Sequence, residues 1–546
     1  MHDDTFFTPL PTPAEMASWD AASVSEFCIP EFTLMENASR EAFHTLTRLI
    51  APKARILVIM GSGNNGGDGA ALARHLADAG HEVLVCHTKP LHALPETSAL
   101  HATLAQRCGV QFVPIALQNG ALSVPTRFLD IAAHPDVVVD ALLGTGLKGE
   151  LRDRERNLVN LVNALKHGAT VISLDIPSGL DGLTGKPRPV AVIADHTVTF
   201  EAAKVGLAFP HAQAYTGTVH VRPIGIPKAA QKITPPSFRM LAPRKHAWPP
   251  YSATMHKGDA GRVLIIGGSK AFSGAPVLAA LGALRAGCGL VTMLCPEGLC
   301  NALRAGFPEI MALPLAGTGA HAETWQGCMI PAVLDALTAL PRHAAVVLGP
   351  GLGRSPATQE LVRMVLEHKK RPGLVLDADG LFPLDTRSDG THSYLLRHLR
   401  EEDCITPHPG EAAHILGTVS GDIQTARVEA FRSLAGASKA VTVLKGAGTL
   451  IGQGDAPITI APFAAPTLAV GGSGDVLSGV IAAHMATLRA TCQPDSPNYS
   501  NIPLLAACLG VYLHGRAGEL LAERYPSRGA LAREIADAIP LAYPEG

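Results

Sequence analysis

The sequence predicts an α/β protein with two domains in series. Short apolar runs alternate with helical stretches from Arg55 to about residue 200, and a second alternating series starts at Val263. Such alternation specifies a mostly parallel sheet covered by helices on both faces. Between residues 223 and 250 the chain carries seven prolines, which disfavour helix and strand alike. We therefore expect domains at 1–232 and 245–546 with a linker between them.

The apolar runs also place the individual elements. In the first domain we expect strands at 56–60, 83–86, 137–139, 171–174 and 198–200, and helices at 70–79 and 155–166. In the second domain we expect strands at 263–266, 290–294, 345–348, 374–376 and 441–444, and helices near 275–287, 355–369, 424–436, 475–488 and 503–523. No convincing repeat relates the two series.

The composition excludes several classes of protein. Of the 546 residues, 47% are hydrophobic and 17% are charged, which indicates a folded globular chain. The 45 basic and 47 acidic side chains nearly cancel, so a nucleic acid or an anionic membrane is not expected as a partner. The ten cysteines form no C-x-x-C, and neither a signal segment nor a membrane-length apolar run is present. We expect a reduced, cytoplasmic protein.

A glycine-rich turn follows the first expected strand, at Gly61–Gly69. A turn between a strand end and a helix N-terminus is an anion-binding geometry, and the glycines formally match G-x-G-x-x-G. However, the acid that binds ribose in NAD-dependent dehydrogenases is missing, because the chain reads Val85-Cys86-His87-Thr88 at that place. The turn instead contains two asparagines and Asp68, which supply oxygen ligands. We expect it to bind a polar ligand, a cation, or both.

Two further strands of the first domain end in carboxylates. Asp140 and Asp175 each follow an apolar run and precede a glycine-containing turn. Because the carboxyl ends of parallel strands face one crevice, we expect these acids to converge there with Asn65 and Ser178. The alternative is that Asp140 and Asp175 are ordinary turn and N-cap residues.

The second domain also has glycine-rich turns that follow apolar runs. Gly349–Gly353 follows one apolar run, and Gly471-Gly-Ser-Gly-Asp475 leads into an apolar helix whose N-terminus can hold a phosphoryl group. Asp475 beside that turn can accept a proton from the hydroxyl being phosphorylated. Alternatively, Asp475 caps the helix, and His408 is an ordinary buried-edge histidine.

Five ordered motifs of the first domain resemble the YjeF N-terminal family, the NAD(P)HX epimerases. They are Leu34-Met-Glu-Asn-Ala38, Asn64-Asn-Gly-Gly-Asp-Gly69, Asp140-Ala-Leu-Leu-Gly-Thr-Gly146, Asp175-Ile-Pro-Ser-Gly-Leu-Asp181 and Thr199-Phe-Glu-Ala-Ala-Lys-Val-Gly206. The resemblance implies a Rossmann-like three-layer sandwich, a potassium ion held by Asn65, Asp140 and Ser178, and Asp175 as acid/base, with Asp68 the less favoured choice. It implies substrate contacts at Asn64, Asn65, Gly66, Gly67, Asp68, Gly144, Thr145, Gly146, Leu147, Lys148, Gly149, Glu150 and Asp175.

The motifs of the second domain resemble the ribokinase-like superfamily. Lys445-Gly-Ala-Gly-Thr449, Gly349-Pro-Gly-Leu-Gly353 and Gly472-Ser-Gly-Asp475 carry that likeness, and Lys257-Gly258 with His408-Pro-Gly-Glu411 points to the NAD(P)H-hydrate dehydratase branch. The resemblance implies a second three-layer sandwich, with ADP as phosphoryl donor and Mg²⁺. It implies nucleotide contacts at Lys445, Gly446, Ala447, Gly448, Thr449 and Gly474, substrate contacts at Ala275, Gly353, His408 and Asp475, and Asp475 as catalytic base.

The tandem order is the pattern of the bifunctional bacterial NAD(P)H-hydrate repair enzymes. The expected substrates are NADHX, NADPHX and ADP, and we expect a homo-oligomer whose size the sequence does not determine. Two other functions compete: a small-molecule kinase fused to a regulatory nucleotide-binding domain, and a non-catalytic binding protein. The acids at 140, 175 and 475 speak against the last. A product assay separates the first two, because a kinase accumulates a phosphorylated product.

Overall fold

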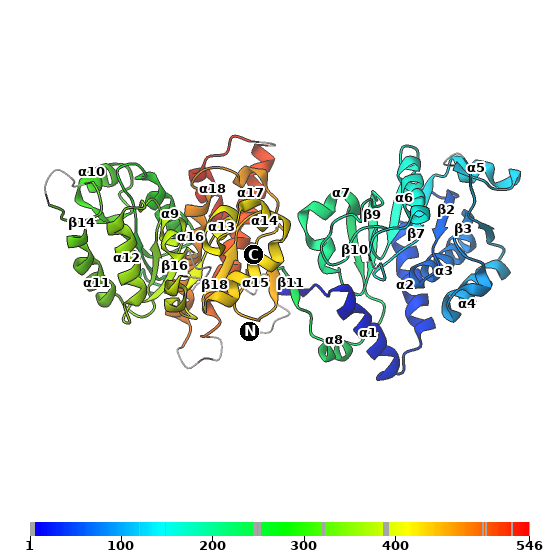
Figure 1. The fold of residues 1–546 in the computed structure, drawn as a ribbon, viewed down its shortest axis with the longest axis horizontal. Helices are drawn as coiled ribbons and strands as arrows, with labels where there is room; N and C mark the ends of the chain where they lie inside the picture. The colour runs from blue at the N-terminus through cyan, green and yellow to red at the C-terminus, as the bar shows by residue number, and fades with distance from the viewer. Residues whose placement is uncertain are drawn as a thin grey trace. The chain divides into compact units, whose positions relative to one another are not determined.

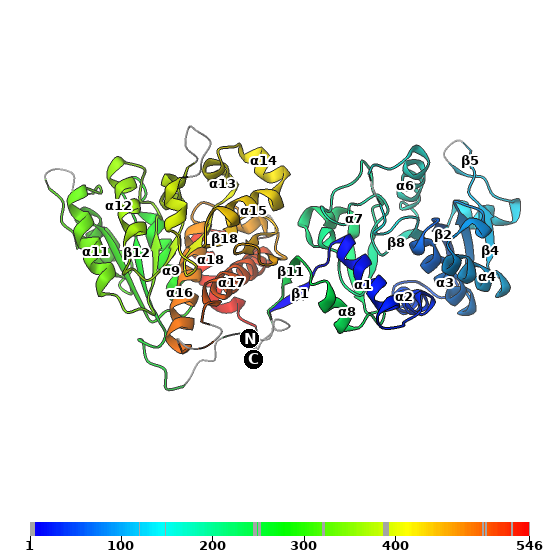
Figure 2. The same cartoon turned by 60° about the horizontal axis from the view of Figure 1, so that its bottom comes forward.

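The computed structural model describes residues 6–118, 121–147, 149–243, 248, 253–318, 323–385, 393–493, 496, 499–525 and 528–544. It divides into two compact units, one formed by Pro9–Arg239 and the other by the remaining described residues. Figures 1 and 2 show the elements of each unit. The division differs from the expected ranges in one respect, because the chain's first described residues belong to the second unit.

A parallel sheet forms the centre of the first unit. Its strands are β2 (Arg55–Met60), β3 (Glu82–His87), β4 (Gln111–Pro114), β7 (Val137–Ala141), β8 (Thr170–Leu174), β9 (His196–Phe200) and β10 (Thr218–Arg222). Their order is β10-β9-β8-β7-β2-β3-β4, and every neighbouring pair is parallel. Chain order reverses between β2 and β7. Such a switch point opens a crevice beyond the strands' carboxyl ends.

Both faces of this sheet are buried, as the alternation along β2 shows. Val58 and Met60 pack into a core with α1 (Pro13–Ser25), α2 (Glu31–Leu46), α3 (Asn64–Asp78) and α4 (Glu96–Arg107). Leu57 and Ile59 point the other way, into a core with α6 (Asp153–Leu165). Successive side chains of a strand face opposite sides, so an entirely apolar run suits a strand with helices on both faces (Figure 1).

The second unit is built on a larger, mixed sheet. Its own strands are β12 (Arg262–Ile266), β13 (Leu290–Pro296), β14 (Met311–Leu315), β15 (Ala345–Leu348), β16 (Gly373–Leu376), β17 (Cys404–Ile405), β18 (Val441–Leu444), β19 (Leu450–Gly452) and β20 (Ile458–Ile460). The order β20-β19-β18-β17-β16-β15-β12-β13-β14 is parallel from β18 to β14 and antiparallel from β18 to β20. The switch point lies between β12 and β15.

The helices around this sheet include α9 (Gly274–Arg285), α12 (Pro356–Glu367), α13 (Pro409–Leu416), α15 (Arg427–Ala437), α16 (Ser473–Thr491), α17 (Ile502–Arg524) and α18 (Ala532–Ala538). Helix α16 is buried over nearly its whole length. A Cβ at Gly479 would lie 1.9 Å from the carbonyl oxygen of Ala279, so glycine allows α16 to touch the backbone of α9. No helix in the described part of the chain is long and apolar enough to cross a membrane.

Two sequence expectations about these elements are wrong. The proline-rich stretch is not a bare linker, since it contains α8 (Lys228–Ile233) and β11 (Phe238–Leu241). Strand β11 extends the second unit's sheet beyond β20, and β1 (Phe7–Pro9) extends it further. Pro227 can precede α8 because a helix N-terminus needs no donor there. Helix α3 also starts at Asn64 instead of residue 70, so much of the glycine-rich segment is helical.

Candidate active sites

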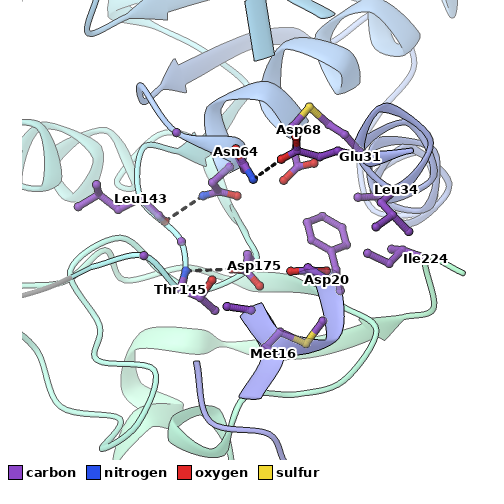
Figure 3. Close-up of a pocket in the computed structure, with 18 of the residues that line it drawn as sticks. Met16, Asp20, Glu31, Leu34, Asn64, Asp68, Leu143, Thr145, Asp175 and Ile224 are labelled. Atoms are coloured by element: carbon purple, nitrogen blue, oxygen red, sulfur yellow. Dashed lines mark hydrogen bonds between the residues drawn. The ribbon is translucent and has the colours of Figure 1, made fainter. Parts of the chain in front are cut away.

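The crevice of the first unit is a cavity of about 580 Å³ (Figure 3). Segments far apart in the sequence line it: α1, α2, the turn before α3 with the first residues of α3, the loop after β7, and residues at or after the ends of β8, β9 and β10. At the turn, Gly63 is the N-cap of α3 and no side chain caps the helix. The first N–H groups of α3 therefore remain available to an anion at the cavity.

Asp140 lies at the centre of a buried polar cluster beside this cavity. Its carboxylate is fully buried and accepts hydrogen bonds from the Ser178 N–H (2.8 Å), the Ser178 hydroxyl (2.6 Å) and the Ser173 hydroxyl (2.8 Å). Burial raises the pKa of Asp140, although the hydrogen bonds from Ser178 oppose the change. Asn65 donates its amide to the Leu143 carbonyl at 2.9 Å, while its own Oδ1 is buried without a partner in the described structure. The three predicted potassium ligands are thus brought together.

Asp175 follows β8 directly and points into the cavity (Figure 3). It is buried, and its backbone has a φ of +65°, a left-handed conformation that non-glycine residues rarely adopt. Its Oδ1 pairs with the Lys204 Nζ at 2.6 Å, and its Oδ2 accepts the Thr145 N–H at 3.1 Å. A Cβ at Gly144 would lie 2.8 Å from Oδ2, so glycine is required beside the carboxylate. Strain and fixed partners hold this group in one orientation.

Two more carboxyl groups, both with raised pKa values, line the same cavity. Burial, with the Asp175 charge added, raises the pKa of Asp68 well above its usual value. Burial also raises the pKa of Asp20 to about 6, against the opposing effect of Lys204. Asp20 belongs to α1, outside the motifs that sequence reading singled out. The cavity therefore contains the ion-paired Asp175, two carboxyl groups that hold a proton more tightly than usual, and Glu31, which accepts a hydrogen bond from the Asn64 amide at 2.9 Å.

The remaining predicted contacts of the first unit fall into three groups. Those that line the cavity are Asn64, Asn65, Asp68, Gly144, Thr145, Gly146, Leu147 and Asp175. Gly66 and Gly67 do not line it; a Cβ at Gly66 would lie 2.2 Å from the Gly61 carbonyl oxygen, so this glycine serves close packing. Gly149 and Glu150 are also outside the lining, and Lys148 lies outside the described residues.

The second unit has a cavity of about 830 Å³ at the carboxyl ends of β16, β17 and β18. The turn before α16 forms one wall, with Gly472 as the helix N-cap at a φ of +91°. A Cβ at Gly474 would lie 3.1 Å from the Lys445 Nζ, so a side chain there would enter the polar part of the cavity. Of the predicted nucleotide contacts, Lys445, Gly446, Ala447, Thr449 and Gly474 line the cavity, and Gly448 does not.

Asp475 is the third residue of α16, not its cap. Because Gly472 holds the N-cap position, the alternative of a capping role for Asp475 is wrong. Its carboxylate makes no hydrogen bond within the described part of the chain. Burial, with the nearby Asp377 carboxylate, raises the pKa of Asp475 to about 8, while Lys445 opposes the shift. A carboxyl group with this pKa can exchange its proton near neutral pH.

Lys445 connects the acids of this cavity. Its Nζ lies 2.7 Å from Asp377 Oδ1 and 3.7 Å from Glu411 Oε2. Burial lowers the pKa of Lys445, but Asp377 and Glu411 outweigh that effect and raise it. Burial raises the pKa of Glu411 as well. The positive charge of Lys445 is therefore shared between Asp377 and Glu411. Asp475 lies beside this group of charges.

His408 is an exposed N-cap, not a buried-edge residue. Its Nδ1 accepts the N–H groups of Gly410 (3.0 Å) and Glu411 (3.3 Å), and its Nε2 lies 3.3 Å from Glu411 Oε1. An accepting Nδ1 leaves the proton on Nε2, which faces the carboxylate. Ala275 and Gly353 do not line the cavity. They lie at the same sheet edge, in the segments that follow β12 and β15.

Sequence reading missed several polar residues of both sites. Lys204 lies within the Thr199–Gly206 motif, but the sequence indicated no role for it. No local sequence pattern marked Asp20 or Glu31 as a residue of the site. In the second unit, His514 of α17 places its Nε2 3.0 Å from both the hydroxyl and the carbonyl oxygen of Ser473. Burial lowers the pKa of His514 to about 4, so it is a neutral partner of the turn before α16. Only the folding of distant segments brings these groups to the cavities.

Comparison with known proteins agrees with a two-site α/β enzyme. The family model described as YjeF-related protein N-terminus matches residues 31–206, and the model described as NAD(P)H-hydrate dehydratase matches 263–541. A "Bifunctional NAD(P)H-hydrate repair enzyme Nnr" from Moorella thermoacetica is 36% identical over 97% of this chain and 96% of that protein. The protein of the same name from Escherichia coli is 34% identical, covering 92% and 88%.

Among solved structures, the ADP/ATP-dependent NAD(P)H-hydrate dehydratase from Bacillus subtilis, co-crystallised with ATP and Mg²⁺, is 29% identical with a TM-score of 0.44. The match covers 55% of this chain and 94% of that one. The full-length relatives define the class as two-domain enzymes of hydrated-nicotinamide repair. The chain belongs to the family of bifunctional NAD(P)H-hydrate repair enzymes. The predicted fusion of an NAD(P)H-hydrate epimerase with an NAD(P)H-hydrate dehydratase is confirmed.

Proposed function

We propose that Asp175 is the acid/base of the epimerase site. C6 of the hydrate bears both a hydroxyl and the ring nitrogen, so removal of the hydroxyl proton opens this hemiaminal-like centre. Closing the ring from the other face then inverts C6. The observation that supports Asp175 is its strained, doubly anchored carboxylate in the cavity, ion-paired with Lys204.

Asp68 supplies the complementary acid in this proposal. Burial and the Asp175 charge raise the pKa of Asp68 well above its usual value, so Asp68 holds a proton more tightly than an ordinary carboxyl group, while Asp175 is ion-paired with Lys204. Ring opening needs a proton on the departing nitrogen while the hydroxyl loses one. A base and an acid in one cavity can perform both transfers, and both carboxyl groups line it.

We also propose that potassium binds beside this cavity. Asn65 Oδ1, a buried acceptor with no partner in the described structure, and the carboxylate of Asp140 would hold it together with the Ser178 hydroxyl oxygen. Amide, hydroxyl and carboxylate oxygens are ligands of hard cations. The bound ion would neutralise the buried Asp140 charge and fix the loop after β7, which includes the Thr145 N–H that contacts Asp175.

For the second unit we propose ADP as phosphoryl donor and Asp475 as base. Asp475 removes the C6 hydroxyl proton as that oxygen bonds to the β-phosphorus and the bond from phosphorus to AMP breaks. The ring-nitrogen lone pair then expels phosphate from C6, and loss of a proton from C5 yields NAD(P)H. N–H groups at the start of α16 stabilise the charge on the phosphoryl oxygens.

Mg²⁺ is expected to arrive on the nucleotide in this proposal. In the described part of the chain no three His, Cys, Asp or Glu side chains form a metal-binding group. Mg²⁺ commonly uses one or two carboxylates together with substrate phosphates, and Asp377 and Glu411 are available at the cavity. The ion would supply neutralisation of phosphate charge.

The decisive experiment gives the intact chain both epimers of NADHX with ADP and magnesium. We expect NADH absorbance to recover in one sustained phase, with one phosphate and one AMP released per NADH. Accumulation of a stable phosphorylated hydrate would instead favour a kinase. Replacing ADP by ATP in a parallel assay identifies the preferred donor.

A further inference from the structure

A third cavity, of about 450 Å³, lies in the second unit away from its active site. It is found at the amino ends of the central strands: Asp403 comes directly before β17, and Lys439 lies two residues before β18. The catalytic groups follow the carboxyl ends of the same strands. The residues lining the cavity are Arg397, Leu399, Arg400, Glu401, Glu402, Lys439, Arg489, Tyr499, Ser500 and Pro503.

The arginines around this cavity outnumber the carboxylates that neutralise them. Arg371, which does not itself line the cavity, donates hydrogen bonds to both carboxylate oxygens of the buried Asp403, at 2.6 and 2.7 Å. Arg400 and Arg489 share Glu402, whose oxygens lie 2.9 Å and 3.8 Å from their guanidinium nitrogens, and Arg400 Nε also lies 3.9 Å from Asp403 Oδ2. Burial, with the charge of Arg371 added, lowers the pKa of Arg400. The lining itself holds four cations, Arg397, Arg400, Lys439 and Arg489, against two carboxylates, Glu401 and Glu402, so it carries a net positive charge.

Arg489 is the most buried of these four cations. The residue is only 6% exposed, and its Nη2 donates to the Glu402 carbonyl oxygen at 3.2 Å. Its Nη1 has no hydrogen-bond partner among the described residues. A Cβ at Gly373 would lie 2.2 Å from Nη1, so glycine at that position makes room for the guanidinium. A buried, incompletely paired guanidinium is costly unless an anion compensates it.

The start of helix α17 at the cavity adds a second attraction for anions. Helix α17 begins there, and neither its N-cap residue nor any other side chain caps it. The helix is 23 residues long, so the positive end of its dipole faces Tyr499 and Ser500 at the cavity. Lys439 and Arg397 supply two exposed cations at the rim.

We propose that this cavity binds a phosphate group, either free phosphate or the phosphate of a nucleoside monophosphate. A dianion matches the net positive charge of the lining, and its oxygens can accept from Arg489 and Lys439. The Ile502 N–H already bonds the Tyr499 carbonyl oxygen and Pro503 has no N–H, so α17 contributes the positive end of its dipole. The volume admits a phosphate with room for an attached group. The site is separate from the reaction chemistry, so it stands whether or not the proposed catalytic roles hold.

Equilibrium dialysis of the full chain with radiolabelled inorganic phosphate tests this site. The buffer has constant ionic strength and saturating ADP, which occupies the active site of the second unit. We expect Arg489→Gln to bind one phosphate fewer per chain than the wild type. Lys439→Ser should weaken that site about fivefold, as expected for loss of one partly exposed charge. Arg533→Ser, which removes an exposed cation elsewhere in this unit, should change nothing.

Competition with unlabelled AMP identifies the source of the phosphate group. Displacement of one phosphate by AMP in wild type, but not in Lys439→Ser at the same concentration, indicates a nucleotide-binding site, and no displacement indicates free phosphate. Equal phosphate stoichiometry and affinity in wild type, Arg489→Gln and Lys439→Ser would overturn the proposal. If Arg489→Gln does not fold, the comparison of Lys439→Ser with Arg533→Ser still tests the site, because both replace exposed side chains. Weaker phosphate binding in Lys439→Ser alone supports the proposal, and equal binding in both overturns it.

Discussion

Asp475→Asn separates a catalytic carboxylate from a structural one. The substitution keeps the size of the side chain but removes the proton-accepting group, so turnover should fall by about 10²-fold or more. Stability should not fall with it, because Gly472 caps α16 and no described hydrogen bond to the Asp475 carboxylate is lost. A merely structural acid at this position would show the opposite pattern.

The raised pKa of Asp475 determines how stability changes with pH. With a folded-state pKa of about 8 against an ordinary value of 3.8, the native protein binds the proton more tightly than the unfolded chain does. This contribution is fully present below about pH 4 and is lost as pH rises to about 8. Between pH 6 and pH 8 the wild type loses about 2 kcal/mol through this group, and asparagine loses none. For a unit of about 300 residues, the variant should therefore gain roughly 3 °C in relative Tm over that interval.

The assay combines NADH recovery with calorimetric melting at pH 6 and pH 8. In the wild type, kcat/KM should rise about tenfold from pH 6 to pH 7, because the base is ionised in only about a tenth of molecules at pH 7. Asp403→Asn is the contrasting control, since it breaks the buried pair with Arg371 and should destabilise the protein at both pH values. Near-wild-type turnover in folded Asp475→Asn, or a Tm loss at both pH values, would refute the reasoning.

Three further predictions concern the other sites. Lys204→Met should remove the ion pair to Asp175 and slow epimerisation by ~10²-fold. NADH recovery from mixed epimers would then show a fast phase and a slow tail. A single sustained phase would contradict a role of the Lys204–Asp175 pair in epimerisation. Asp140→Ala should abolish potassium-dependent stabilisation in melting experiments, and an unchanged potassium response would move the ion elsewhere. Deleting residues 1–9 should destabilise the second unit by ~1–3 kcal/mol, because β1 and the buried Phe6 are lost; unchanged dehydratase-domain melting would show that this strand contributes nothing.

The last prediction bears on the expected domain boundaries, 1–232 and 245–546. A fragment with the second range lacks both β1 and β11, which extend the sheet beyond β20. We still propose that each domain folds alone, since each has its own core. A fragment starting at Phe238 keeps β11 and should be more soluble than 245–546, which exposes the edge of β20.

Local sequence was sufficient to predict a structural feature wherever that feature is formed by one continuous segment of the chain. Apolar runs such as 56–60 and 345–348 predicted buried strands, because a strand with helices on both faces must be apolar throughout. Glycine-rich turns after those strands predicted where ligands approach the backbone. The carboxylates at strand ends, Asp140 and Asp175, followed from the geometry of parallel sheets. Family resemblance then supplied chemistry that spacing alone left open.

Only the tertiary structure decided which distant groups meet and in which protonation state. Asp20 and Lys204 come from segments about 180 residues apart, and no local pattern marks either as a neighbour of Asp68. The pKa of a carboxyl group depends on burial and on charges that folding brings near. The raised pKa values of Asp68 and Asp475 therefore have no signature in the sequence. The sequence thus determined the order of strands, turns and reactive groups along the chain, while long-range packing determined their environment, because desolvation and electrostatic coupling depend on distance in space and not on separation along the chain.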